Sequence, residues 1–139
     1  MTDAELREIL QTTKVIAVVG FSAKPDRASH YVAAFLQAKG YRVIPVNPGL
    51  AGQSYLGETV FADLASIPAG IAVDMVDIFR APEAVPGIVD EALAHLPALR
   101  TVWMQLGVIS AEGAARARAA GKRVVMDHCP KMEIPRLGL

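Results

Sequence analysis

VIAVVGFSAKPDR, residues 15–27, shows most directly how this chain folds. Its first five residues form an uninterrupted apolar run rich in β-branched side chains. Such a run is typical of a strand covered on both faces, as in a parallel sheet. A glycine and a polar turn follow, and residues 27–39 then carry apolar side chains at helical spacing before Gly40 ends the pattern. This stretch predicts the first strand–turn–helix unit of an α/β fold.

The rest of the chain repeats the alternation. A capping-box pair, Thr2 and Glu5, predicts an N-terminal helix. Further strands are expected at 42–46, 71–79, 100–104 and 123–126, helices at 84–95 and 110–120, a helical turn within 62–67 and a folded-back tail at 127–139.

Alternating strands and helices predict a Rossmann-like three-layer α/β sandwich around a five-stranded parallel sheet, with residues 1–139 forming one domain. Right-handed crossovers leave few topologies, and the commonest orders the strands 3-2-1-4-5. The first and fourth strands would then lie side by side where the winding reverses. Ligands of such folds bind there, beyond the carboxyl ends of the strands.

Composition excludes several classes of function. The chain has 14 Lys and Arg against 14 Asp and Glu, so it lacks the basic excess of a nucleic-acid binder. The apolar run at 15–20 is too short to cross a membrane, and the acidic N-terminus differs from a signal peptide, so we expect a cytoplasmic protein. One cysteine permits neither an internal disulfide nor a cysteine-rich zinc site. An anionic ligand would therefore depend on a local cluster of cations.

The turn after the first strand is the strongest candidate for such a cluster. It lies where dinucleotide-binding folds place their phosphate loop, at a helix N-terminus with free amide hydrogens and partial positive charge. Gly20 permits a tight turn, Ser22 adds a hydroxyl donor, and Lys24 and Arg27 add cations. An ordinary surface loop is an equally good interpretation of these residues alone, because the full glycine fingerprint is absent.

Two departures argue against a nicotinamide cofactor. Ser22 and Pro25 occupy the second and third glycine positions of G-x-G-x-x-G. The second strand ends in Asn47-Pro48, where nicotinamide enzymes usually carry an acid for the ribose diol. Asn47-Pro48 is either a plain turn or a flat wall beside an adenine ring.

Two later loops offer polar side chains near the same edge. Arg80 follows the third strand and could reach a phosphate, although a loop arginine is usually only solvated. Gln105 follows the fourth strand and could hydrogen-bond a ligand amide, or simply face water. No spacing of ligating residues indicates a metal site.

Asp127-His128-Cys129-Pro130 raises an alternative in which the protein is an enzyme. A cysteine beside a histidine can be an activated nucleophile. Adjacent residues of an extended segment point to opposite sides, however, so a direct Cys129–His128 pair is not expected. A buried structural cysteine is the commoner outcome.

Five segments, in order along the chain, carry a resemblance to a known family. They are Val18–Ser22 with Lys24-Pro25 and Arg27–Ser29, Gly40-Tyr41 with Pro45–Pro48, Asp74–Asp77 with Phe79-Arg80, Val102–Gly107, and Val125–Cys129. The chain resembles the small bacterial CoA-binding proteins. These are similar to the N-terminal domain of the succinyl-CoA synthetase alpha subunit.

The resemblance implies a Rossmann-like domain that binds the nucleotide end of coenzyme A or an acyl-CoA, with no protein partner specified. It implies no catalysis, because the synthetase's phosphorylated histidine lies in a second domain that residues 1–139 do not match. The alternative is an enzyme that acts on an acyl-CoA or nicotinamide substrate through Cys129 or His128. The synthetase's second loop carries a lysine where this chain has Leu50, so the cations must come from elsewhere. The candidate ligand-binding residues are Gly20, Phe21, Ser22, Ala23, Lys24, Pro25, Arg27, Asn47, Pro48, Phe79, Arg80, Met104, Gln105 and Leu106.

Overall fold

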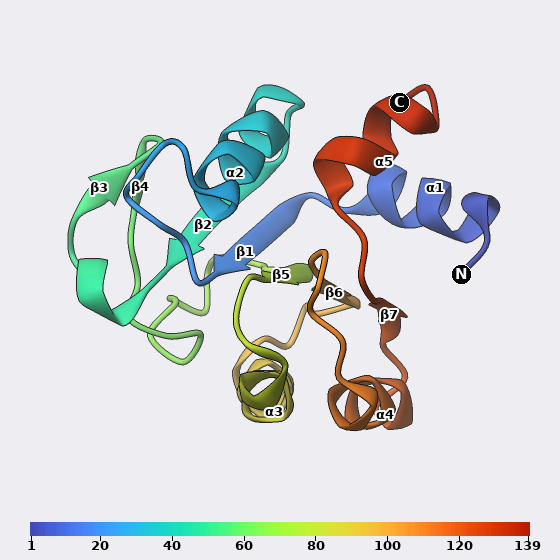
Figure 1. The fold of residues 1–139 in the computed structure, drawn as a ribbon. Coiled ribbons are helices and arrows are strands. Elements are labelled where there is room, and N and C mark those ends of the chain that lie inside the picture. Colours follow the sequence, from blue (N-terminus) through green and yellow to red (C-terminus); the bar gives the residue numbers. More distant parts are fainter.

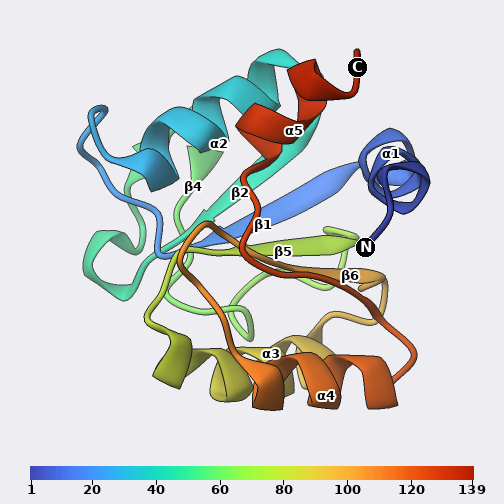
Figure 2. The ribbon, with the colours of Figure 1, turned by 45° about the vertical axis from the view of Figure 1, so that its right-hand side comes forward.

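A computed structural model describes residues 1–139 as a parallel five-stranded sheet between two layers of helices (Figures 1 and 2). The sheet has the order β2 (Arg42–Val46), β1 (Val15–Val19), β5 (Met75–Ile78), β6 (Thr101–Met104) and β7 (Arg123–Val125). One face is covered by α1 (Asp3–Thr12), α2 (Ala28–Ala38) and α5 (Pro130–Arg136), and the other by α3 (Val85–His95) and α4 (Ala111–Ala119). The predicted α/β sandwich is confirmed.

The predicted strand order 3-2-1-4-5 is wrong. Counting only the five strands of this sheet, the observed order is 2-1-3-4-5, so β1 pairs with β2 on one side and with β5 on the other. Pro45 lies in β2, opposite Val18 of β1, and proline has no N–H to donate to a second neighbouring strand. The observed order puts β2 at the sheet edge, where that missing donor costs nothing. Pro45 was the sequence signal for this order.

The connection from β2 to β5 accounts for the remaining differences. Instead of an α-helix it holds a 3₁₀ turn, η1 (Pro48–Leu50), and a short antiparallel hairpin of β3 (Ser54–Tyr55) and β4 (Glu58–Thr59). The helical turn expected within 62–67 does not form. Leu64 and Ile67 are nevertheless buried in the same hydrophobic cluster as Ala17 of β1 and Ile44 of β2, so this irregular segment contributes to the core where a helical turn is expected.

Helix termini follow the sequence closely. The capping box of Thr2 and Glu5 opens α1, and the Ser110 side chain accepts a hydrogen bond from the Gly113 amide at the start of α4. A 3₁₀ turn, η2 (Pro82–Ala84), leads into α3. The expected tail instead forms α5, which packs against α2. Every helix is too short or too polar to span a bilayer.

The corrected order moves the point where the winding reverses to between β1 and β5. The chain leaves β1 for α2 on one face of the sheet, and leaves β5 for α3 on the opposite face (Figure 2). The turns after β1 and β5 are therefore neighbours, and the loop after β6 follows next to them. Folds of this order bind their ligands at this reversal.

Candidate functional site

The start of α2 presents backbone donors without partners. Its N-cap residue, Arg27, makes no side-chain capping bond, and the amides of Ala28 and Ser29 donate to no acceptor in the protein. The preceding turn is fixed by the Ser22 hydroxyl, which accepts from the Lys24 amide at 3.1 Å, and by the Ser22 carbonyl, 2.8 Å from Nδ1 of His30. The helix start is thus open rather than plugged by a side chain, as an anion-binding turn requires.

Gly20 allows the turns after β1 and β5 to touch. It has φ +90°, and a Cβ built there would lie 2.6 Å from the Phe79 carbonyl oxygen and 3.0 Å from Cδ of Arg80. The Gly20 amide donates to the Val46 carbonyl at 3.0 Å, which ties the same residue to the end of β2. Any other residue at this position would be strained and would push apart the loops that form the site.

Three hollows adjoin one another along this edge of the sheet. The middle one, about 380 Å³, lies over the start of α2 and is lined by Gly20, Ser22, Lys24, Arg27, Ala28, Ser29 and Phe79. A second, about 300 Å³, shares Gly20 and extends toward α3 past Pro48 and Arg80. A third, about 340 Å³, shares Ala28 and Phe79 and extends between α2 and α5. Because neighbouring hollows share these residues, the three together are here called the edge groove.

The chemistry of the edge groove changes from end to end. Lys24, Arg27 and Arg80 form no ion pairs, so three unpaired cations face its middle and α3 portions in a chain of zero net charge. The portion toward α3 also contains the carboxylates of Asp63 and Glu91, which suit hydroxyl and amino donors better than a phosphate. A phosphate would accordingly suit the middle portion better.

The portion between α2 and α5 is mostly apolar, and we call it the apolar end. Its walls are Ala28, Tyr31, Val32, Phe79, Gln105, Leu106, Cys129, Lys131 and Met132. Tyr31, Leu106 and Met132 at its rim are 44%, 51% and 59% exposed, which is unusual for large apolar side chains grouped together. Gln105 is only 5% exposed, and its Oε1 has no hydrogen-bond partner. This end therefore suits an elongated, largely apolar group that carries a hydrogen-bond donor.

The structure brings nine of the fourteen candidate residues to the edge groove. They are Gly20, Ser22, Lys24, Arg27, Pro48, Phe79, Arg80, Gln105 and Leu106.

 These nine residues come from four separate turns of the chain, and Ala28 and Ser29 line the groove beside them.

The other five candidates lie away from the groove walls. Phe21 is fully buried and packs on the His30 ring, with centroids 5.0 Å apart. Asn47 donates from its amide to the Phe21 carbonyl at 2.7 Å and accepts from the Gly49 amide at 2.8 Å, so it holds the two turns together. Met104 is buried among core residues of the opposite face. Ala23 and Pro25 line none of the three hollows.

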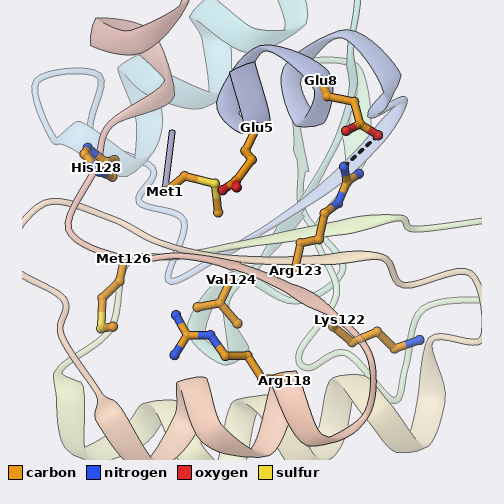
Figure 3. A pocket seen from close by; sticks show the side chains of 9 residues that line it. All are labelled: Met1, Glu5, Glu8, Arg118, Lys122, Arg123, Val124, Met126 and His128. Carbon is orange, nitrogen blue, oxygen red and sulfur yellow. Dashed lines mark ion pairs between the residues drawn. The ribbon is translucent and has the colours of Figure 1, made fainter. Parts of the chain in front are cut away.

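Cys129 and His128 face different cavities, as their adjacency predicts. Cys129 lines the apolar end, whereas His128 lines a cavity of about 490 Å³ at the β7 edge, between α1 and α4 (Figure 3). Nδ1 of His128 lies 3.2 Å from Oε1 of Glu133. Cys129 and His128 are therefore not paired with each other in this structure. The β7-edge cavity mixes acids of α1 with cations of α4 and β7, and none of the fourteen candidates lines it.

Sequence reasoning missed several walls of the groove. Ala28 and Ser29 belong to a segment that carries the family resemblance but are not among the fourteen candidates, although small residues at a helix start allow a ligand close approach. Lys131 and Met132 belong to α5, which forms where the sequence predicts a folded-back tail. Pro130 at the first position of α5 was the available signal, because proline favours that position.

Comparison with known proteins supplies the family. Residues 14–135 match the family described as CoA binding domain. This chain belongs to that family. A Bacillus subtilis (strain 168) relative, the uncharacterized protein YneT, is 40% identical over 130 residues, covering 93% of this chain and 91% of that protein. The resemblance to CoA-binding proteins expected from the five segments is confirmed.

Solved structures share the fold of this family member over nearly its whole length. A Thermus thermophilus protein described as cell-free ID.343 has a TM-score of 0.91 and 39% identity, with 99% of each chain covered. A hypothetical protein from Pyrococcus horikoshii OT3 has a TM-score of 0.90 and 33% identity, covering 100% of this chain and 94% of that one. An acetyl-coenzyme A synthetase from Ca. Korarchaeum cryptofilum, at 23% identity and a TM-score of 0.66, shows the fold alone; 84% of this chain covers 26% of it.

Proposed function

We propose that this protein binds coenzyme A, or an acyl-CoA, in the edge groove. The observation that carries the proposal is the order of the three portions. A nucleoside-sized hollow with acids and Arg80 adjoins an open helix start with cations, which in turn adjoins the apolar end. Coenzyme A has the same order of parts: adenosine with its 3′-phosphate, a diphosphate, and a pantetheine arm that ends in a thiol.

The diphosphate would lie over the start of α2. There the free amides of Ala28 and Ser29 and the cations of Lys24 and Arg27 supply donors to its oxygens. The adenosine would lie between Pro48 and Arg80, with Asp63 and Glu91 available to its hydroxyl and amino groups. The pantetheine arm would enter the apolar end, where the unpaired Oε1 of Gln105 can accept from one of its amides.

Calorimetric titration of the purified protein with coenzyme A, ATP and NAD tests the proposal. Coenzyme A should bind most tightly, and its affinity should fall as salt is added, because the cations around the diphosphate are exposed. Binding of NAD without binding of coenzyme A would overturn the assignment.

Two variants locate the ligand. Ser22→Asp should abolish binding, because a carboxylate at the turn repels the diphosphate. Arg27→Ala should weaken it about tenfold or more, since a hydrogen bond to a charged group contributes ~1.5–3 kcal/mol. Arg118→Ala is the matched control: it removes another exposed arginine, at the β7-edge cavity. Equal losses in Arg27→Ala and Arg118→Ala would place the ligand elsewhere.

A further inference from the structure

The only cysteine of the chain lies in the portion of the groove proposed for the thiol-bearing arm. Cys129 is the N-cap residue of α5, is 6% exposed, and lines the apolar end. Cys129 belongs to the hydrophobic core on this face of the sheet and also lines a hollow that continues into the groove.

A second observation indicates that a ligand completes this end. Gln105 lines the same portion and is only 5% exposed, and its side-chain Oε1 has no hydrogen-bond partner. A buried amide oxygen without a hydrogen bond costs about 1–3 kcal/mol. A donor on the ligand would remove that cost. Gln105 and Cys129 thus point to one elongated ligand with an amide along its length and sulfur near its end.

We propose that Cys129 forms a reversible mixed disulfide with coenzyme A. This inference rests on the proposed function, because the edge groove must first bind the nucleotide part. The co-reactant is oxidised coenzyme A, its symmetrical disulfide. The Cys129 thiolate attacks one sulfur of that disulfide, a bond forms between Sγ and that sulfur, and the original sulfur–sulfur bond breaks. The second coenzyme A leaves as a thiolate and takes a proton from water.

The surroundings of Cys129 favour this exchange over hydrolysis or acyl transfer. His128 faces the β7-edge cavity and Glu133, so no histidine is paired with the thiol as a general base. Thiol–disulfide exchange needs none, because the thiolate itself is the nucleophile. Nζ of Lys131 lies 5.9 Å from the Tyr31 ring centroid, which keeps a cation at the mouth of the apolar end. The exposed rim of Tyr31 and Met132 would cover the bound arm.

The experiment follows the intact mass of the reduced protein after removal of reductant. Incubation with coenzyme A disulfide should add one coenzyme A by a bond that dithiothreitol reverses, and Cys129→Ser should gain nothing. The reaction should be about tenfold or more faster than with oxidised glutathione, because the groove raises the local concentration of the first disulfide only. Ser22→Asp should slow the reaction with coenzyme A disulfide and leave that with cystamine, a small disulfide without a nucleotide, unchanged.

No adduct, or equal rates with coenzyme A disulfide and oxidised glutathione, would overturn the proposal. An adduct that resists dithiothreitol but yields to hydroxylamine would also overturn it, because that behaviour identifies a thioester. Titration of the reduced wild-type protein with coenzyme A in excess reductant reports separately on the proposed function. Binding in that titration without adduct formation rejects the disulfide alone, whereas absence of both rejects the binding site.

Discussion

Replacing Asp77 should stabilise the protein, and increasingly so as pH rises. Asp77 lies in the centre of the sheet, between Val18 of β1 and Trp103 of β6. It is fully buried, and neither of its carboxylate oxygens has a hydrogen-bond partner. Burial raises the pKa of Asp77 well above its usual value of 3.8, because the charged form loses its hydration.

The sign and size of the effect follow from proton linkage. Between pH 3.8 and the raised pKa, the folded protein holds a proton on Asp77 that the unfolded chain has released. Stability supplied by this group is therefore complete below pH 3.8 and is lost as pH rises through that window. The loss is about 1.4 kcal/mol per pH unit. Asp77→Asn keeps the shape and removes the titration, so its advantage should grow at that rate. Asp77→Leu, similar in shape, should add about 2 kcal/mol from apolar burial.

Reversible urea unfolding of the wild type, Asp77→Asn and Asp77→Leu at several pH values measures these differences. The other titrating groups are common to the three proteins, so they cancel when one free energy of unfolding is subtracted from another. A difference between wild type and Asp77→Asn that stays constant with pH, or shrinks as pH rises, would refute the reasoning. It would mean that Asp77 is ionised in the folded protein and stabilised by a partner.

Three further substitutions test other parts of the structure by urea unfolding. Gly20→Ala should cost at least about 1–3 kcal/mol from its φ of +90°, and should also weaken coenzyme A binding by separating the two turns. Gly113→Ala should destabilise the protein, because the added Cβ would lie 2.6 Å from Cγ1 of Val85. Gly87→Ala should stabilise it by about 0.5–1 kcal/mol, because an added Cβ there has no neighbour within 4 Å. Stability changes of the same sign in both variants would contradict the packing of α3 on α4. Asn47→Ala should cost about 1–3 kcal/mol through its two lost hydrogen bonds, and an unchanged stability would remove its role in joining the turns.

Local sequence predicted the elements well where one or two residues decide them. Thr2 and Ser110 start helices as expected, and the run at 15–19 forms a strand buried on both faces. The third strand, expected over residues 71–79, spans only Met75–Ile78. Residues 71–74 precede the ladder of strand hydrogen bonds, and the Asp74 carboxylate instead accepts from the amides of Lys14 and Val15. Contacts of this kind join distant parts of the chain, so no local pattern reveals them.

The strand order decides which loops meet at the site, and Pro45 indicates one part of that order, the edge position of β2. With strands in the order 3-2-1-4-5, the turn at Gly20 would have met the loop after Met104 directly. The observed order instead places Phe79 and Arg80 against Gly20, with the Phe79 amide donating to the Val19 carbonyl at 2.9 Å. Arg80 of that loop thereby lines the groove, whereas the loop after β2 has Leu50 rather than a cation. Pro45, which has no N–H and lies in the edge strand, thus bears on which arginine lines the edge groove.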